Sequence, residues 1–273
     1  MKPIIVPTDF SPTALSAVNY AADMALALDA ALILLHVYQV PVSVTETTTI
    51  LVPVEEMEEN AERRLESLKN DLRHITSDKL EITTEARLGD VTEELEQSCN
   101  KNDPFIVIMG TTGHGAFERS IFGSTTLSVI KHLEYPVLTV PKGTEYGKGI
   151  KKIGLAWDFV NENELTAAPL IVSIVKLFGA SLHVLHVEFE NSNLPADHIN
   201  PVLQQSLVTV KPTYHHLHNT ELGEGINSYT EKNNLDLLIT LPRKHTFFDS
   251  LFNKNSTREL LQVTHIPVLC IHA

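Results

Sequence analysis

The sequence predicts an α/β protein built from two doubly wound, five-stranded parallel-sheet domains in tandem. The first observation is an internal repeat, because three segments recur in the same order with similar separations. The matched pairs are ALILLHV at 31–37 with ASLHVLHV at 180–187, EARLGD at 85–90 with NTELGE at 219–224, and YPVLTV at 135–140 with IPVLCI at 266–271. The second observation is that short apolar runs alternate with amphipathic segments, which is typical of right-handed βαβ crossovers and a parallel sheet.

The first repeat predicts five strands separated by four helices. The expected strands are 2–8, 32–37, 80–88, 105–109 and 137–140, which are rich in apolar or β-branched residues. The first helix begins with Ser11 as a predicted N-cap and Pro12 at the first helical position, and its apolar face extends to Leu28. Further helices are expected at 57–72, 92–99 and 125–133.

The second repeat predicts the same series of elements. Its strands are expected at 152–157, 182–187, 213–219, 235–241 and 268–272, and its helices at 165–178, 201–207, 225–232 and 257–263. Three glycines lie in the segment from Gly143 to Gly149, a composition typical of a linker. We therefore expect one domain at 1–145 and a second at 150–273.

The composition indicates a globular protein with an acidic surface. The chain has 273 residues, a net charge of −13 and a hydrophobic content of 43%. This charge argues against a nucleic-acid partner, because phosphate backbones are bound through a surplus of Lys and Arg. Neither a secretory signal nor a membrane span is recognisable, and Cys99 and Cys270 lie too far apart to indicate a disulfide framework. We expect a cytoplasmic protein that binds neither nucleic acid nor membrane.

The segment after the fourth strand of the first repeat is the strongest candidate for a binding site. Ligands of open α/β sheets bind beyond the carboxyl ends of the strands, where the strand order reverses. Gly110 and Gly113 lack the Cβ atoms that would hold a polyphosphate away from the backbone, so their N–H groups can line an anion site. Gly123, Ser124 and Thr125 begin the next helix, whose N-terminus favours the same anion.

These residues resemble the signature of the ATP-binding universal stress proteins, G-x2-G-x9-G-[ST]. Here the signature reads Gly110-x2-Gly113-x9-Gly123-Ser124. The segments VPTDFS at 6–11 and LLHV at 34–37 are similar to that family's first strand and turn and to its second strand. The resemblance covers essentially the whole chain, twice. It implies ATP as the ligand, with or without Mg²⁺, or ADP or AMP in its place.

The resemblance also implies a role for each site residue. Asp9 would contact the adenosine, and the Val37 backbone would meet the adenine edge. The pocket around the adenosine would be shaped by Pro7 and Thr8. The ribose and phosphates would be held by Gly110, Gly113, Gly123, Ser124 and Thr125.

The resemblance further implies that the fifth strands, at 136–141 and 267–272, pair antiparallel. The two halves would then form a pseudo-dimer within one chain. Whether two chains also form a homodimer is left open.

From the residues alone, Asp9 has a second interpretation, because in the turn at 8–11 its side chain can bond the local backbone.

The corresponding loop of the second repeat departs from the signature. We expect Thr240, Arg243 and Asn253 at the positions of the three glycines, with one extra residue nearby, and Trp157 at the position of Thr8. Side chains would then fill the space that a phosphate needs. We expect this half not to bind ATP in the family's manner. Its basic cluster at 243–245 either meets an anion or belongs to a solvated or interdomain loop.

The histidines allow more than one interpretation. His216 and His218 would share a face of one strand, a spacing that can bind a metal, but an edge strand kept polar against aggregation is the alternative. His36 and His186 end matching strands of the two repeats, and we expect both to be structural.

The motifs leave three functional hypotheses. The chain has no Gly-x4-Gly-Lys-[Ser/Thr] loop, kinase signature or Gly-x-Ser-x-Gly turn. The leading hypothesis, implied by the resemblance, is a non-enzymatic, ATP-binding regulator of stress responses. The second is slow ATP hydrolysis or autophosphorylation on Ser124, Thr125 or Thr126. The third is an interaction scaffold in which the second repeat docks a partner through Phe247, Phe248 and Phe252. The alternative for these aromatic residues is that they pack against the first repeat.

Overall fold

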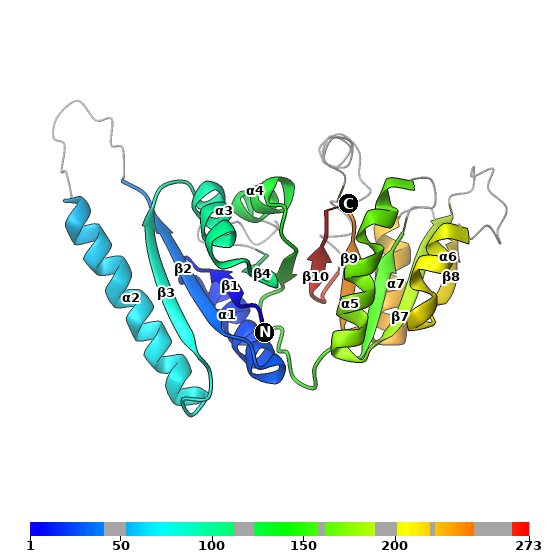
Figure 1. The fold of residues 1–273 in the computed structure, drawn as a ribbon, viewed down its shortest axis with the longest axis horizontal. Helices are drawn as coiled ribbons and strands as arrows, with labels where there is room; N and C mark the ends of the chain where they lie inside the picture. Colours follow the sequence, from blue (N-terminus) through cyan, green and yellow to red (C-terminus); the bar gives the residue numbers. More distant parts are fainter. Residues whose placement is uncertain are drawn as a thin grey trace.

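The structure is a computed structural model that describes residues 1–40, 53–111, 123–157, 162–188, 201–218, 222–242 and 264–272. Figure 1 shows two similar α/β halves side by side, joined through the centre of one sheet. The predicted helix at 257–263 lies outside the described residues. Within them, no helix combines the length and the apolar character that crossing a membrane requires.

The described part of the first half contains the five strands and four helices that the sequence predicts, and no end differs from its predicted position by more than three residues. The strands are β1 (Ile4–Pro7), β2 (Leu32–Tyr38), β3 (Ile82–Leu88), β4 (Ile106–Gly110) and β5 (Val137–Val140). The helices are α1 (Pro12–Leu28), α2 (Val54–Ile75), α3 (Val91–Asn102) and α4 (Ser124–His132). The Ser11 Oγ accepts a hydrogen bond from the Ala14 N–H at 3.2 Å, which confirms the predicted N-cap of α1.

The second half repeats this order of strands. They are β6 (Lys152–Ala156), β7 (Ser181–Glu188), β8 (Thr213–His218), β9 (Leu237–Thr240) and β10 (Val268–Cys270). The helical segments are η1 (Glu162–Ala167), α5 (Ala168–Phe178), α6 (Pro201–Leu207), η2 (Val208–Val210) and α7 (Leu222–Asn233). The first three residues of the helix predicted at 165–178 belong to η1, so the α-helix begins only at Ala168.

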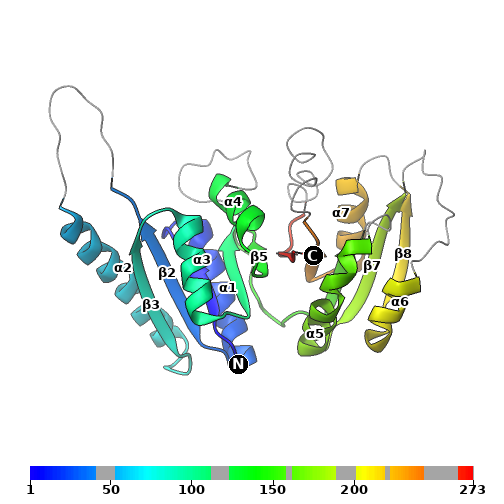
Figure 2. The ribbon, with the colours of Figure 1, turned by 45° about the horizontal axis from the view of Figure 1, so that its top comes forward.

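The ten strands form one sheet in the order β3-β2-β1-β4-β5-β10-β9-β6-β7-β8. Neighbouring strands are parallel within each half, and β5 and β10 pair antiparallel between the halves. The Thr139 hydroxyl reinforces this junction by donating to the Val268 carbonyl oxygen at 3.1 Å. The antiparallel pairing of the fifth strands is therefore confirmed, and Figure 2 shows β5 facing the second half.

The sheet is covered on both faces, as in other doubly wound folds. Alternate residues of β1 point to opposite faces: Ile4 and Val6 join the core under α1 and α2, and Ile5 joins the core under α3 and α4. The same two cores continue through the second half, one under α5 and α6 and the other under α7. The α/β fold predicted from alternating periodicity is confirmed.

The glycine-rich segment between β5 and β6 packs against the first half. The Tyr146 ring meets the Tyr20 ring of α1 edge-on, with centroids 5.4 Å apart. The Gly143 N–H donates to the Ser16 Oγ at 3.3 Å. The start of β6 is held in turn by the Asp236 carboxylate, which accepts from the Lys152 N–H at 2.8 Å. The connection is thus anchored at both ends.

Candidate functional site

The strand order places a reversal point between β1 and β4. From β1 the chain moves outward to β2 and β3, and then crosses to β4 and β5 on the other side. Because β1, β2 and β4 are parallel, their carboxyl ends meet at one edge of the sheet. The segments that follow β1 and β4, and the end of β2, therefore lie together where ligands of such sheets bind.

The turn after β1 is held by short hydrogen bonds. The Thr8 N–H continues the ladder to the Leu35 carbonyl oxygen at 2.8 Å. The Thr8 Oγ1 accepts from the Phe10 N–H at 3.0 Å, and the Asp9 Oδ1 accepts from the Ser11 N–H at 2.9 Å. Asp9 therefore has the local backbone role that the sequence allowed as its second interpretation, and its contact with adenosine stays a prediction.

Phe10 is a feature of this turn that the sequence analysis missed. Its φ is +61°, a left-handed conformation that bulky residues rarely adopt. Its ring lies 4.7 Å from the His36 ring, and the Arg64 Cζ lies 4.0 Å from its centroid. Such a cation–π contact stabilises by about 0.5–1 kcal/mol at exposed sites. The Arg64 guanidinium of α2 thus contacts the turn that contains Asp9, and no sequence motif near either residue indicates this contact.

His36 and His186 have the structural role that we expected. The His36 Nδ1 lies 2.7 Å from the Thr8 carbonyl oxygen, and the His186 Nδ1 lies 3.4 Å from the Trp157 carbonyl oxygen. Burial lowers the pKa of His36, although its bond to the backbone opposes that effect. Each histidine therefore ties the end of the second strand of its half to the end of the first.

Gly110 has a packing role that the sequence did not indicate. A Cβ atom added there would lie 2.8 Å from the Thr13 carbonyl oxygen and 2.9 Å from its carbon. Real Cβ atoms essentially never approach backbone so closely, so only glycine lets α1 lie directly on β4. The space that a side chain at Gly110 would need is taken by the Thr13 backbone of α1. The approach of a phosphate to Gly110 stays a prediction.

The start of α4 is fixed to the end of β4. The Gly123 N–H donates to the Thr111 carbonyl oxygen at 2.7 Å, and the Thr126 Oγ1 donates to the Gly110 carbonyl oxygen at 3.0 Å. Gly123 is the N-cap and supplies no side chain to bond the first-turn N–H groups. Ser124 and Thr125 are exposed. The positive end of α4 thus lies beside the reversal point.

Most of the predicted site residues therefore come together at one sheet edge. These residues are Pro7, Thr8, Asp9, Val37, Gly110, Gly123, Ser124 and Thr125. Gly113 lies outside the described residues, as do Phe247, Phe248 and Phe252 of the scaffold hypothesis. Lys131 lies in the last turn of α4, about 10 Å along the axis from the start of the helix.

The predicted alignment of the second-half loop with the first-half glycine loop was wrong by one residue at its start. The Val107 N–H donates to the Pro136 carbonyl oxygen at 2.9 Å, and the Leu238 N–H donates to that of Pro267 at 3.0 Å. These equivalent pairs are equally far apart along the chain, so the predicted extra residue does not exist. Leu241, rather than Thr240, takes the place of Gly110. Thr240 is instead equivalent to Met109, and Arg243 and Asn253 lie outside the described residues. The prediction failed because dissimilar loops offer no fixed point for alignment.

Large side chains fill the equivalent edge of the second half. Leu241 and Trp157 are each only 4% exposed and belong to the same core as α5. The Trp157 N–H bonds the Leu185 carbonyl oxygen at 3.0 Å, as Thr8 bonds Leu35 in the first half. A leucine cannot allow the close helix approach that Gly110 allows. Consistent with this, η1 replaces the first turns of α1.

The metal interpretation concerned His216 and His218 of β8, and the His218 side chain lies outside the described part of the structure. Among the described residues, no group of three or more His, Cys, Asp or Glu side chains is arranged to hold a metal ion. The His216 ring meets the His186 ring edge-on at 5.9 Å. β8 is the last strand of the sheet, which agrees with the alternative of a polar edge strand.

Comparisons with known proteins agree with this fold. The model of the universal stress protein family matches residues 1–141. A universal stress protein of Methanocaldococcus jannaschii is 31% identical over 144 residues, which cover 52% of this chain and 82% of that protein. A universal stress protein structure from Archaeoglobus fulgidus has a TM-score of 0.74 at 18% identity, covering 99% of this chain and 96% of that one. A functionally unknown protein from Pseudomonas aeruginosa has a TM-score of 0.62 at 14% identity, covering 100% and 92%.

Proposed function

Because the chain belongs to the universal stress protein family, we propose that its first domain, residues 1–145, binds ATP or the related nucleotides ADP or AMP. The protein then acts as a non-enzymatic regulator in the stress response. The second domain, residues 150–273, does not bind a nucleotide in this manner. The observation that carries the proposal is the start of α4, which lies at the reversal point of the first half without a capping side chain.

The start of α4 favours an anion for two reasons. The first-turn N–H groups of a helix have no partner within the helix, and the helix dipole places about half a positive charge there. Ser124 and Thr125 add exposed hydroxyl groups beside those N–H groups. Phosphate groups bind such helix starts in many nucleotide-binding folds.

The end of β1 is the proposed adenosine side of the site. Asp9 is half-buried there, next to the buried Thr8. A carboxylate has about four acceptor positions, so the bond from the Ser11 N–H is compatible with a ribose hydroxyl on the same group. Val37, near the end of β2, lies on the same edge and offers its backbone to the adenine.

The distribution of cations favours holding a nucleotide over cleaving it. Phosphoryl transfer needs positive charges at the developing anion. Of the cations in the described part of this region, Lys131 lies at the opposite end of α4 and Arg64 contacts the Phe10 ring, while Arg119 of the glycine loop lies outside the described residues. The site is therefore suited to binding without turnover, and Mg²⁺ would supply the main positive charge near the phosphates.

Titration calorimetry with Mg-ATP tests the proposal, with Thr125→Glu as the variant and Thr125→Gln as its control. The glutamate carboxylate would sit at the helix start, where it stabilises α4 by about 0.3–1 kcal/mol. The same carboxylate would repel the phosphates and weaken binding by about tenfold or more. Thr125→Gln should change both quantities little. Equal ATP affinity in Thr125→Glu and wild type, or no binding by wild type, contradicts the proposal.

Autophosphorylation is the second candidate function, because Ser124 and Thr125 expose their hydroxyls at the proposed phosphate site. Thr126 is a poor acceptor, since it is buried and its hydroxyl already donates to Gly110. Mass spectrometry of the peptide spanning these residues after incubation with ATP decides the matter. An unmodified peptide would rule out autophosphorylation without contradicting nucleotide binding. Parallel titrations with ADP and AMP identify the preferred nucleotide.

A further inference from the structure

The last strand of the second half leads to a contact with a helix of the first half. The His272 Nε2 lies 2.7 Å from the Ile130 carbonyl oxygen, which belongs to the last turn of α4. A carbonyl oxygen can only accept a hydrogen bond, so the imidazole donates from Nε2. This bond connects the second half to the helix whose start is the proposed phosphate site.

The sheet fixes the position of His272. β10 ends at Cys270, and the Ile271 N–H continues its ladder to the Thr240 carbonyl oxygen at 3.1 Å. Cys270 is buried in the core under α3 and α4. Side chains alternate along a strand, so His272, two residues beyond Cys270, lies on the same side and meets α4. The imidazole thus approaches α4 from backbone that the sheet holds in place.

The Ile130 carbonyl oxygen depends on a partner from outside its helix. The last four carbonyl groups of an α-helix have no partner within it. The Leu133 N–H still bonds the Val129 carbonyl oxygen at 2.9 Å, but Leu133 itself is extended, with φ −79° and ψ 125°, so the helical pattern ends there. Ile130 supplies the next carbonyl group. His272 satisfies it with a side chain from the other half of the chain.

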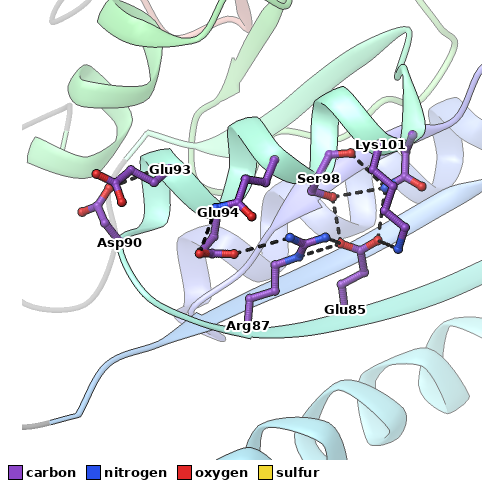
Figure 3. A network of polar contacts seen from close by, with 9 residues as sticks. Glu85, Arg87, Asp90, Glu93, Glu94, Ser98 and Lys101 are labelled. Atoms are coloured by element: carbon purple, nitrogen blue, oxygen red, sulfur yellow. Dashed lines mark hydrogen bonds and ion pairs between the residues drawn. The ribbon is translucent and has the colours of Figure 1, made fainter.

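The neighbouring helix α3 is held in a different way. Its Ser98 hydroxyl donates to the Glu85 carboxylate of β3 at 2.9 Å, and Lys101 lies 3.3 Å from the same carboxylate (Figure 3). Arg87 of β3 pairs with Glu94 of α3 at 3.4 Å. Charged groups therefore fasten α3 to a strand of its own half, whereas the end of α4 is bound by the second half.

The internal repeat shows that His272 is a departure from the first half. YPVLTV at 135–140 matches IPVLCI at 266–271, so Pro141 is the counterpart of His272. A proline has no N–H group and its ring carries no donor. Position 141 therefore cannot make the equivalent bond, and the donor is a feature of the second half.

We propose that His272 is a positioning residue, through which the second half holds α4 and the phosphate end of the nucleotide site. This inference rests on the proposed function, because it gives the second half a role at that site. The start of α4 is tied to β4 by the Gly123 N–H and the Thr126 hydroxyl. Ile130 lies about 9 Å along the helix axis from Ser124. With both ends tied, the first-turn N–H groups keep one position relative to the sheet edge.

The position of α4 matters more for the phosphates than for the adenosine. In the proposed site the phosphates meet the start of α4, whereas the adenosine lies beside the ends of β1 and β2. A loosened α4 therefore lowers the affinity for ATP and leaves the affinity for adenosine nearly unchanged. Because coupling between sites is reciprocal, ATP in turn strengthens the contact between α4 and the second half. The second half would thus respond to a nucleotide that it does not itself bind.

Amide hydrogen exchange of the full chain tests the positioning without any nucleotide. His272→Leu removes the donor, and His272→Gln keeps an N–H donor of similar reach. The α4 peptide should exchange faster in His272→Leu than in wild type, and His272→Gln should restore the protection. His265→Leu, at an exposed histidine just before β10, is the matched control and should exchange like wild type. Equal exchange of α4 in wild type and His272→Leu overturns the proposal.

Titration calorimetry with Mg-ATP and with adenosine tests the coupling to the site. We expect His272→Leu to bind ATP at least about fivefold more weakly than wild type, with its adenosine affinity within about twofold. His272→Gln should bind both like wild type. An equal loss for both ligands, or no loss for ATP, refutes the inference while the proposed function stands. If wild type binds no ATP, the proposed function fails and the inference fails with it.

A second variant keeps the result decisive if His272→Leu folds poorly. His272→Ala removes the donor without adding an apolar group to a half-buried position. It should show the same faster exchange of α4 and the same selective loss of ATP affinity. An alanine variant that binds ATP like wild type contradicts the proposal.

Discussion

Gly110→Ala should destabilise the protein in the absence of any ligand. The new Cβ would lie 2.8 Å from the Thr13 carbonyl oxygen and 2.9 Å from its carbon, both backbone atoms near the start of α1. Gly110 is not among the residues with positive φ, so alanine meets no strain of its own there. The substitution therefore tests a single contact between α1 and β4.

The expected magnitude follows from that contact. Overpacking in a tight site costs about 1–3 kcal/mol. The reduced freedom of the unfolded chain offsets about 0.4–1 kcal/mol of this. A net loss of about 1–2 kcal/mol corresponds to a fall in melting temperature of about 2–8 °C for a chain of this size. Thermal and urea unfolding, followed by circular dichroism without nucleotide, measure it.

Gly154→Ala in β6 is the matched control for Gly110→Ala. Its Cβ would meet the Leu235 Cδ1 at 2.7 Å and the Leu238 Cδ1 at 3.2 Å, and both are ends of flexible side chains. We expect a smaller loss than at Gly110, because leucine can change rotamer whereas the Thr13 backbone is fixed in α1. If Gly110→Ala unfolds like wild type but loses nucleotide binding, the packing explanation is wrong and the glycine serves the ligand.

Two further predictions concern ionisable groups. Burial raises the pKa of Glu85, but hydrogen bonds from Asn102, Arg87 and Ser98 outweigh it and lower the pKa below its usual value. The stabilisation from Glu85 is then present above the unfolded pKa of about 4.3 and is lost as pH falls through the lower folded pKa. Urea unfolding should show wild type more stable than Glu85→Gln at pH 7, with the gap closing below about pH 4; a gap independent of pH contradicts this. Burial raises the pKa values of Cys99 and Cys270 to about 12, so neither thiol should react with a disulfide reagent at about pH 8 until denaturant is added. Fast labelling of the native chain would refute it.

The sequence predicted the fold because its signals are local. Alternation of apolar runs and helical faces located every described strand, and the internal repeat predicted that both halves share one strand order. The N-cap at Ser11 was also predictable, since it depends on residues only three apart. Helix and strand ends shifted by a few residues, because end turns depend on packing as well as on propensity.

The sequence could not predict contacts between distant residues. The cation over Phe10 comes from Arg64 on α2, and no pattern near either residue indicates it. The packing role of Gly110 depends on where α1 lies, so the sequence suggested only the ligand. The equivalence of Leu241 to Gly110 became clear from backbone hydrogen bonds, because side chains in that loop share nothing with the first repeat.

The junction of β5 with β10 has a consequence for assembly. The edges of β5 and β10 that would otherwise be exposed pair with each other. Because the segment between β5 and β6 links the two halves covalently, each half is held near the other at an effective concentration of roughly the millimolar range. Dilution therefore cannot separate this pair, as it would separate two free subunits. A second copy of the chain finds that edge already occupied and must associate through another surface.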